Sequence, residues 1–353
     1  MTAVALDAMG GDDAPRVTVE GALEAAAAGI EVILVGDSEV LGHELNRLTG
    51  PHGTTKGTKG GSTKDGVTNL RIVHAPDQVA MGDHAAREVR RQRQTSLYVG
   101  MELVKSGDAS ALVSMGNTGA GMATALVVLG RLKGVERPAL GAVIPAGDGN
   151  VLFLDVGANA DARTSHLVQF AHLGSAYMQS VYGVEHPRVA LLSIGEEPSK
   201  GSALVIEAHE ALAQADISNG GRIRFVGNIE GRDLLTQQAD VIVADGFTGN
   251  VALKIAEGLV SYLFDSLRTA ARSSLRAKVG GLLLYPSLRG VRDRLDYRVH
   301  GAVPLLGVDG GVFIGHGRSD GHAVASALKT AQHAVDRGML PALAASIAEG
   351  LPK

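Results

Sequence analysis

Hydrophobic positions follow two patterns along this chain of 353 residues. Short runs of consecutive Val, Leu, Ile and Ala alternate with longer segments in which apolar residues return every three or four positions. The first pattern predicts strands that are buried on both faces, and the second predicts amphipathic helices. The predicted strands are Ala3–Asp7, Glu31–Gly36, Leu70–His74, Ala109–Ser114, Leu140–Pro145, Val151–Val156, Arg188–Ser193, Arg222–Val226 and Asp240–Ala244.

Helical patterns fill most of the gaps between these runs. The predicted helices are Val17–Ala28, Asp83–Lys105, Gly119–Leu132 and Arg163–Val181. Alternation of strands and helices predicts an α/β fold with a mostly parallel sheet flanked by helices. The length suits one large domain, so we expect a single α/β domain over residues 1–353.

One segment shows neither of these two patterns. Residues 49–68 consist mainly of Gly, Thr and Lys and contain no phosphate-binding G-x-x-x-x-G-K-[ST] sequence. A run of small and polar residues without apolar periodicity is typical of a loop. We therefore expect a flexible Gly/Thr-rich insert between the second and third strands.

Residues 251–298 predict a protruding helical hairpin. Val251, Ile255, Leu259, Leu263 and Leu267 recur every four residues and form one apolar stripe, which would lie in the core or in a dimer interface.

The second half of this hairpin combines apolar and basic residues. Residues 282–285 read Leu-Leu-Leu-Tyr, and the segment 268–298 carries eight basic and two acidic residues, a net charge of +6. An apolar tip between basic stems suits the surface of an anionic membrane. We therefore expect a membrane-binding tip at 282–285.

Composition narrows the class of protein. The chain has no cysteine, which excludes disulfides, thiolate metal ligands and a cysteine acyl-enzyme. The net charge of −4 argues against bulk binding of nucleic acid. We see no signal peptide and no apolar run of 18 residues, so we expect a cytoplasmic protein.

Five predicted strands end in polar, Gly-rich turns. These turns are 7–13, 114–119, 155–161, 193–201 and 245–250. Because ligands of open α/β sheets bind beyond the carboxyl ends of strands, we expect the five turns to form one pocket. Glycines let backbone N–H groups approach an anion, and helices that begin near Gly119 and Gly249 add their positive dipole ends.

Several polar residues of these turns are candidates for the site. Thr118 and Thr248 are either ligand contacts or helix caps. Lys200 is the cation within the turns, and it either meets a phosphate group or is a solvated surface residue. His316, in a further Gly-rich turn at 313–319, has either a catalytic or a structural role.

Motifs of other enzyme classes are absent from the sequence. It contains no G-x-G-x-x-G dinucleotide fingerprint, no G-x-S-x-G nucleophile elbow and no H-E-x-x-H zinc motif. We therefore expect neither a cofactor nor a metal. Two alternatives stay open: an NAD-dependent dehydrogenase on a related fold, and a non-catalytic adaptor at the membrane surface.

The turns resemble those of the phosphate acyltransferases of bacterial phospholipid synthesis, the PlsX family. The resemblance runs through nearly the whole chain, although Met115 and Ile314-Gly-His-Gly differ from the usual family pattern. The matching stretches are Leu-Asp-Ala-Met-Gly-Gly-Asp at 6–12, Gly-Asn-Thr-Gly-Ala at 116–120, Glu-Arg-Pro-Ala-Leu at 136–140, Leu-Asp-Val-Gly-Ala-Asn at 154–159, Arg-Val-Ala-Leu-Leu-Ser-Ile-Gly-Glu-Glu at 188–197, Asp-Gly-Phe-Thr-Gly-Asn-Val at 245–251 and Gly-Ala-x-x-Leu-Leu-Gly at 301–307.

The resemblance implies a fold like that of isocitrate dehydrogenase and phosphate acetyltransferase. It also implies a homodimer that moves a long-chain acyl group from acyl carrier protein to inorganic phosphate. The acyl phosphate would pass to a membrane glycerol-3-phosphate acyltransferase. The single domain would then be catalytic, and the protein would be in peripheral contact with the membrane.

On this hypothesis phosphate needs orientation more than deprotonation, and backbone N–H groups stabilise the oxyanion. We expect Asp7, Asp155 and Asp245 to orient the turns, and Lys200 or His316 to help the thiolate leave. The residues expected to form the site are Asn117, Lys200, Asn250 and His316 for catalysis, and Asp7, Gly10, Gly11, Thr118, Gly119, Asp155, Asn159, Asp245, Thr248 and Gly249 for substrate and phosphate.

Overall fold

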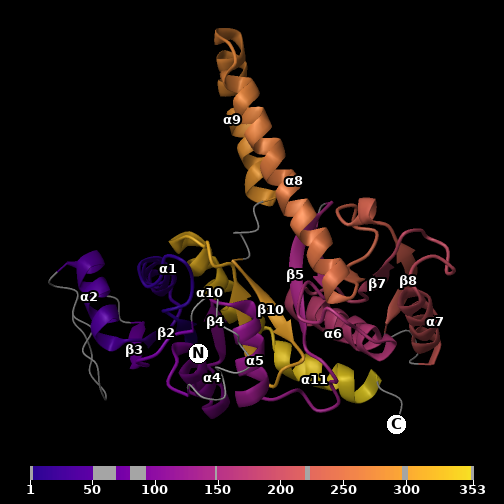
Figure 1. The fold of residues 1–353 in the computed structure, drawn as a ribbon, viewed down its shortest axis with the longest axis horizontal. Coiled ribbons are helices and arrows are strands. Elements are labelled where there is room, and N and C mark those ends of the chain that lie inside the picture. Colours follow the sequence, from indigo (N-terminus) through magenta and orange to yellow (C-terminus); the bar gives the residue numbers. More distant parts are fainter. Residues whose placement is uncertain are drawn as a thin grey trace.

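The computed structural model describes residues 3–50, 69–79, 93–147, 149–218, 223–295 and 301–350. Within these ranges, eleven strands form one sheet in the order β3-β2-β1-β4-β11-β10-β5-β6-β9-β7-β8 (Figure 1). The strands are β1 (Val4–Asp7), β2 (Val32–Gly36), β3 (Leu70–His74), β4 (Ala111–Ser114), β5 (Ala139–Ala146), β6 (Gly149–Leu154), β7 (Arg188–Leu192), β8 (Arg224–Ile229), β9 (Val241–Val243), β10 (Ala302–Leu306) and β11 (Gly311–Gly315).

The sheet consists of two parallel blocks. One block contains β3, β2, β1, β4 and β11, and the other contains β6, β9, β7 and β8. Between them β10 is antiparallel to both β11 and β5, and β5 is antiparallel to β6. The two blocks therefore run in opposite directions.

Helices cover both faces of the sheet, and each face has its own aliphatic core. Residues of α1, α6, α10 and α11 pack on one face, and residues of α4, α5 and the first turns of α8 pack on the other. The helices are α1 (Arg16–Ala27), α2 (Ser38–Thr49), α4 (Ser96–Ser106), α5 (Thr118–Val128), α6 (Thr164–Tyr182), α7 (Ala203–Ser218), α8 (Gly246–Arg272), α9 (Leu275–Leu295), α10 (Gly321–Asp336) and α11 (Met339–Gly350), with a short 3-10 helix η1 (Gly231–Asp233).

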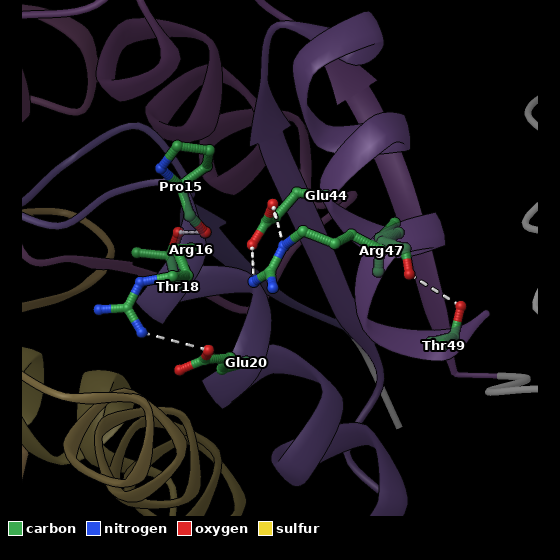
Figure 2. A network of polar contacts seen from close by, with 8 residues as sticks. Pro15, Arg16, Thr18, Glu20, Glu44, Arg47 and Thr49 are labelled. Atoms are coloured by element: carbon green, nitrogen blue, oxygen red, sulfur yellow. Dashed lines mark hydrogen bonds and ion pairs between the residues drawn. The ribbon is translucent and has the colours of Figure 1, made fainter.

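Helices α1 and α2 show how the surface differs from the interior (Figure 2). On α2, Arg47 donates to both carboxylate oxygens of Glu44 at 2.9 and 2.6 Å, an exposed pair that contributes little to stability. On α1, the buried Thr18 hydroxyl lies 2.7 Å from the Ala8 carbonyl oxygen and 2.8 Å from that of Pro15. The buried contact fixes the start of α1 against the turn that follows β1.

All nine predicted strands exist, each within a few residues of its expected bounds. Two strands were missed. β10 contains Pro304, and β11 begins at Gly311, so neither has the appearance of a typical strand. The predicted turn at 313–319 begins only at His316, after β11 ends. For the predicted helix Asp83–Lys105, only α4 is described, because residues 80–92 lie outside the described ranges, as does most of the insert, 51–68.

The predicted hairpin is present as α8 and α9, which rise together from the body of the molecule (Figure 1). Its turn lies at Ser273 and Ser274, so the prediction of a tip at 282–285 was wrong. Leu282, Leu283 and Leu284 are instead exposed side chains within α9. The helix α9 continues past Pro286 to Leu295, so this proline does not end it.

The apolar stripe on α8 is exposed along its length. Its five residues, Val251, Ile255, Leu259, Leu263 and Leu267, are all exposed in the single chain. The alternative that placed this stripe in the core is therefore wrong, and the dimer interface stays a prediction.

Candidate active site

A cavity of about 270 Å³ lies between β5, β10 and the start of α8. Most of its wall is apolar, and five polar side chains open onto it. The apolar and small lining residues are Leu140, Ala142, Val143, Ile144, Val156, Gly157, Leu253, Gly301, Ala302, Val303, Ile314 and Gly315; the polar ones are Thr118, Asn250, Lys254, Glu257 and His316.

Both blocks of the sheet contribute to this cavity. Thr118 and His316 follow β4 and β11 of one block, whereas Gly157 and Asn250 follow β6 and β9 of the other. Three of the five predicted turns therefore meet here, together with the turn after β11. The turns 7–13 and 193–201 supply none of the lining residues, so the expectation that all five form one pocket was only partly met.

Asp155 organises the turn that follows β6. Its buried carboxylate accepts hydrogen bonds from the backbone N–H groups of Leu140, Gly157, Ala158 and Asn159, at 3.1, 3.1, 2.9 and 2.7 Å. Burial raises the pKa of Asp155, and these hydrogen bonds oppose that rise. The contacts match the predicted orienting role.

Asn159 closes the same turn. Its side-chain amide donates to Asp155 at 2.9 Å and lies 2.7 Å from the carbonyl oxygen of Pro138. Asn159 is buried and does not line the cavity. Its position therefore supports the turn, and contact with a substrate stays a prediction.

The start of α8 packs directly against the Asp155 turn. A Cβ atom on Gly249 would lie 1.9 Å from the carbonyl oxygen of Asp155, so only glycine fits there. Asp245 caps the helix: its carboxylate accepts from the N–H and the hydroxyl of Thr248, at 2.9 and 2.6 Å. This close contact brings Asn250 beside Gly157 at the cavity.

In the first block, Asp7 organises the turn that follows β1, as Asp155 does for the turn that follows β6. Its buried carboxylate accepts from the hydroxyls of Ser96 and Ser114 at 2.6 and 2.7 Å, and burial raises its pKa. A Cβ on Gly10 would lie 2.9 Å from the Gly116 backbone nitrogen. Asp7, Gly10 and Gly11 therefore hold the turns together from behind, outside the lining of the cavity.

The caps of α5 and α8 differ from those considered in the sequence. Asn117 caps α5, since its side-chain oxygen accepts from the Ala120 N–H at 3.0 Å, and Asp245 caps α8. Thr118 and Thr248 are not the caps. Thr118 lines the cavity, whereas Asn117, Gly119, Thr248 and Gly249 do not.

The two candidates for aiding the leaving group lie in different places. His316 lines the cavity, and its Nδ1 accepts a hydrogen bond from the Arg318 N–H at 3.2 Å, which puts the proton of the neutral ring on Nε2. Lys200 is exposed in the turn after β7 and is not a lining residue. A direct role of Lys200 therefore has no geometric support.

Sequence reasoning missed Lys254 and Glu257. Both line the cavity, and their side chains are joined by an ion pair of 2.8 Å. A signal was present, because Lys254 lies four residues after Asn250 on a predicted helix and must share its face. Neither residue belongs to a Gly-rich turn, the feature on which the prediction of the site rested.

Two further findings concern the membrane and metals. None of the helices in the described ranges is long and apolar enough to cross a bilayer. His, Asp and Glu side chains in those ranges form no group of three that could hold a metal ion. The absence of a cofactor stays a prediction.

The fold is shared with solved structures over nearly the whole chain. EutD phosphotransacetylase from Staphylococcus aureus is 18% identical with a TM-score of 0.58, covering 94% of each chain. A phosphotransacetylase from Streptococcus pyogenes is 18% identical with a TM-score of 0.59, covering 95% of this chain and 94% of the other. At such identities the likeness concerns the fold alone. It places this protein in the phosphotransacetylase fold class, as predicted.

Sequence comparison then gives the family. The model of the family described as fatty acid synthesis protein matches residues 2–341. A phosphate acyltransferase from Thermus thermophilus is 50% identical over 337 residues, 96% of each chain. Another, from Pelotomaculum thermopropionicum, is 44% identical over 345 residues, 98% of this chain and 94% of the relative. The chain belongs to this family, that of the PlsX-type phosphate acyltransferases, and is an acyltransferase.

Proposed function

We propose that this enzyme transfers a long-chain fatty acyl group from acyl carrier protein to inorganic phosphate, giving acyl phosphate for phospholipid synthesis. The proposal rests on the presence of both apolar walls and polar side chains in one cavity. Its walls on β5 and β10 are aliphatic and suit an acyl chain, whereas Thr118, Asn250 and His316 supply polar groups for the reacting atoms. Family membership favours this reaction over the dehydrogenase and the adaptor.

The residues of the cavity suit direct transfer. An oxygen of hydrogen phosphate attacks the thioester carbonyl carbon, the C–S bond breaks, and the thiolate takes up the phosphate proton. The helices α5 and α8 both begin at the cavity, so their positive dipole ends favour the phosphate dianion and the developing oxyanion. Neutral donors such as the Asn250 amide would add to this stabilisation.

The deciding experiment incubates the purified protein with palmitoyl-acyl carrier protein and inorganic phosphate. We expect acyl phosphate, trapped as its hydroxamate, together with one free carrier thiol for each acyl group transferred. The activity should survive treatment with EDTA and should need neither ATP nor NAD. Reduction of NAD without thiol release would instead support the dehydrogenase.

Substitution of Asn250 tests the site directly. We expect Asn250→Ala to lower turnover roughly a hundredfold with little change in stability, because it removes an exposed donor at the cavity. Asn117→Ala tests the other amide, but it also removes the cap of α5, which costs about 1 kcal/mol. Asn117→Ser keeps a cap and is therefore the matched variant. Wild-type turnover in folded Asn250→Ala would contradict the assignment.

We also propose that a second copy of the chain covers the α8 stripe. The exposed row of Val251, Ile255, Leu259, Leu263 and Leu267 is continuous along one face, as expected for a helical dimer contact. Leu259→Glu combined with Leu263→Glu should produce monomers in analytical ultracentrifugation. A wild type that sediments as a monomer at micromolar concentration would exclude the dimer.

The hairpin further supports peripheral membrane contact of a cytoplasmic enzyme. Leu275 at the turn is 81% exposed, and Leu283 within α9 is 75% exposed, with Arg272, Arg276 and Lys278 exposed nearby. Apolar side chains beside cations suit an anionic membrane surface, where each cation contributes about 1 kcal/mol. Contact with the membrane would deliver labile acyl phosphate to a glycerol-3-phosphate acyltransferase there.

A further inference from the structure

Lys254 is the only lysine or arginine among the described residues that line the cavity. It lies one helical turn after Asn250 and one turn before Glu257, so these three residues share one face of α8. That face of α8 forms part of the cavity wall. The cavity lining therefore contains one basic side chain, one helical turn from the Asn250 amide.

Glu257 restrains this positive charge. Its carboxylate lies 2.8 Å from the Lys254 ammonium group, and the Lys254 side chain is 52% exposed while that of Glu257 is 28% exposed. An exposed pair of this kind adds little to stability. Its geometry is nevertheless useful at a binding site, because it limits the positions of a flexible four-carbon side chain and leaves two ammonium protons available.

The charge balance of the cavity requires such a cation. Without Lys254, its lining would carry the negative charge of Glu257, and a phosphate dianion would enter against it. Helix ends and neutral amides offset only part of that repulsion. With Lys254 present, the charges of the Lys254–Glu257 pair offset each other before phosphate enters, and the ammonium group supplies a point charge to the anion.

We propose that Lys254 binds the inorganic phosphate and that Glu257 is its positioning residue. This rests on the proposed function, and it gives Lys254 the role that the sequence suggested for Lys200. The ammonium group acts only as a hydrogen-bond donor in this step. It holds two phosphate oxygens while the third attacks the carbonyl carbon, the C–S bond breaks, and the phosphate proton passes to the thiolate.

The test combines direct binding of phosphate with steady-state kinetics. We expect Lys254→Met to weaken binding of radiolabelled phosphate and raise the KM for phosphate roughly 10- to 150-fold, the range for a lost hydrogen bond to a charged group. The KM for acyl carrier protein should change little, and Lys254→Arg should restore part of the phosphate affinity. Glu257→Gln removes a negative charge, which by itself favours phosphate, so a raised KM for phosphate with nearly unchanged kcat would show that the loss of positioning outweighs this gain.

The matched control is Arg47→Met. Arg47 also pairs with a glutamate on its own helix and has a similar side-chain exposure of 48%, but it lies on α2, outside the lining of the cavity. It should leave both phosphate binding and turnover unchanged.

Binding and turnover separate the two proposals. If wild type binds phosphate, Lys254→Met does not, and no acyl phosphate is ever formed, then Lys254 is confirmed as the phosphate ligand and the proposed reaction is wrong. Equal phosphate affinity in Lys254→Met and wild type would overturn the inference. So would a wild type that does not bind phosphate even at millimolar concentration.

Discussion

The two ends of α8 lie in contrasting environments. At its first turn, Gly246 and Gly249 are buried against the Asp155 turn, and the backbone contact leaves no space for a side chain. Beyond Glu257 the helix leaves the body of the molecule, and a Cβ atom added at Gly258 would meet no neighbouring atom within 4 Å. One helix thus combines a rigid junction at the cavity with an exposed arm.

The polar groups at the two ends of α8 also differ in their environment. At the junction, the Asp155 carboxylate is fully buried and accepts four backbone hydrogen bonds. On the arm, ion pairs such as Arg268–Asp265, whose charged atoms are 2.9 Å apart, lie in solvent. Solvent screening makes the arm's pairs nearly neutral for stability, whereas an unpaired group at the junction would be costly. Packing therefore fixes the structure of the junction. The surface of the arm contributes little to stability and is available for contact with other molecules.

The largest expected effect comes from a methyl group at the junction. Gly249→Ala should lower the free energy of unfolding by about 3 kcal/mol or more and abolish activity, because the new Cβ would lie 1.9 Å from a backbone oxygen that cannot move aside. Urea denaturation followed by circular dichroism measures the change.

Gly258→Ala is the control on the same helix. With open space around it, this variant should gain roughly 0.5–1 kcal/mol from the better helix propensity of alanine. Equal stability of Gly249→Ala and Gly258→Ala would show that the backbone at the junction moves to accommodate a methyl group. It would contradict the difference between the two ends of α8.

A pH series separates the body from the arm. His172 on α6 is buried, its Nε2 has no hydrogen-bond partner among the described residues, and burial lowers its pKa to about 4. The unfolded chain takes up this proton near pH 6.5, whereas the folded chain does so only near pH 4. Stability is therefore full above pH 6.5 and lost as the pH falls towards 4, by about 2 kcal/mol at pH 5.

The matching variant is His172→Phe, which keeps a ring and removes the titration. The difference in unfolding free energy between wild type and His172→Phe should change by about 2 kcal/mol from pH 7 to pH 5. Asp7 and Asp155, whose pKa values burial raises, act in the opposite sense and cancel in the difference. A difference that is independent of pH would show that His172 takes up its proton at the same pH in the folded and the unfolded chain.

The smallest effect on stability is expected on the arm. Leu283→Glu combined with Leu284→Glu should change the free energy of unfolding by less than about 0.5 kcal/mol, because both side chains are exposed. Flotation with phosphatidylglycerol liposomes should nevertheless show loss of membrane binding. Binding equal to that of wild type would move the contact to the turn near Leu275, and no binding of wild type would exclude the membrane proposal.

Much of the fold could be predicted because it depends on local patterns. Runs such as Val32–Gly36 are apolar on both faces, which identifies strands of a covered parallel sheet. The Gly-rich turns marked the ends of the strands. β10 and β11 were missed because Pro304 and the glycines around β11 hide their pattern, and they form strands through pairing with β5 and β4.

The candidate site was predicted less completely. Thr118, Asn250 and His316 line the cavity, whereas Lys200 lies outside it, and Lys254 and Glu257 were not considered. The turns can be predicted from the sequence because they are rich in Gly and polar residues. Membership of a cavity wall depends instead on which helix face is turned inwards, and this is set by packing.

The amino-acid sequence by itself determined the class of fold, the family and the helical nature of residues 251–298. Periodicity, turn residues and ordered motifs are local features, and each can be identified without knowing its neighbours in space. Only the tertiary structure decided which turns meet, because the two blocks are joined through β10 and β5, which are far apart in the sequence and pair only in the folded chain. It also decided that the α8 stripe is exposed, since an apolar stripe has the same sequence pattern in a core and on an unpaired surface.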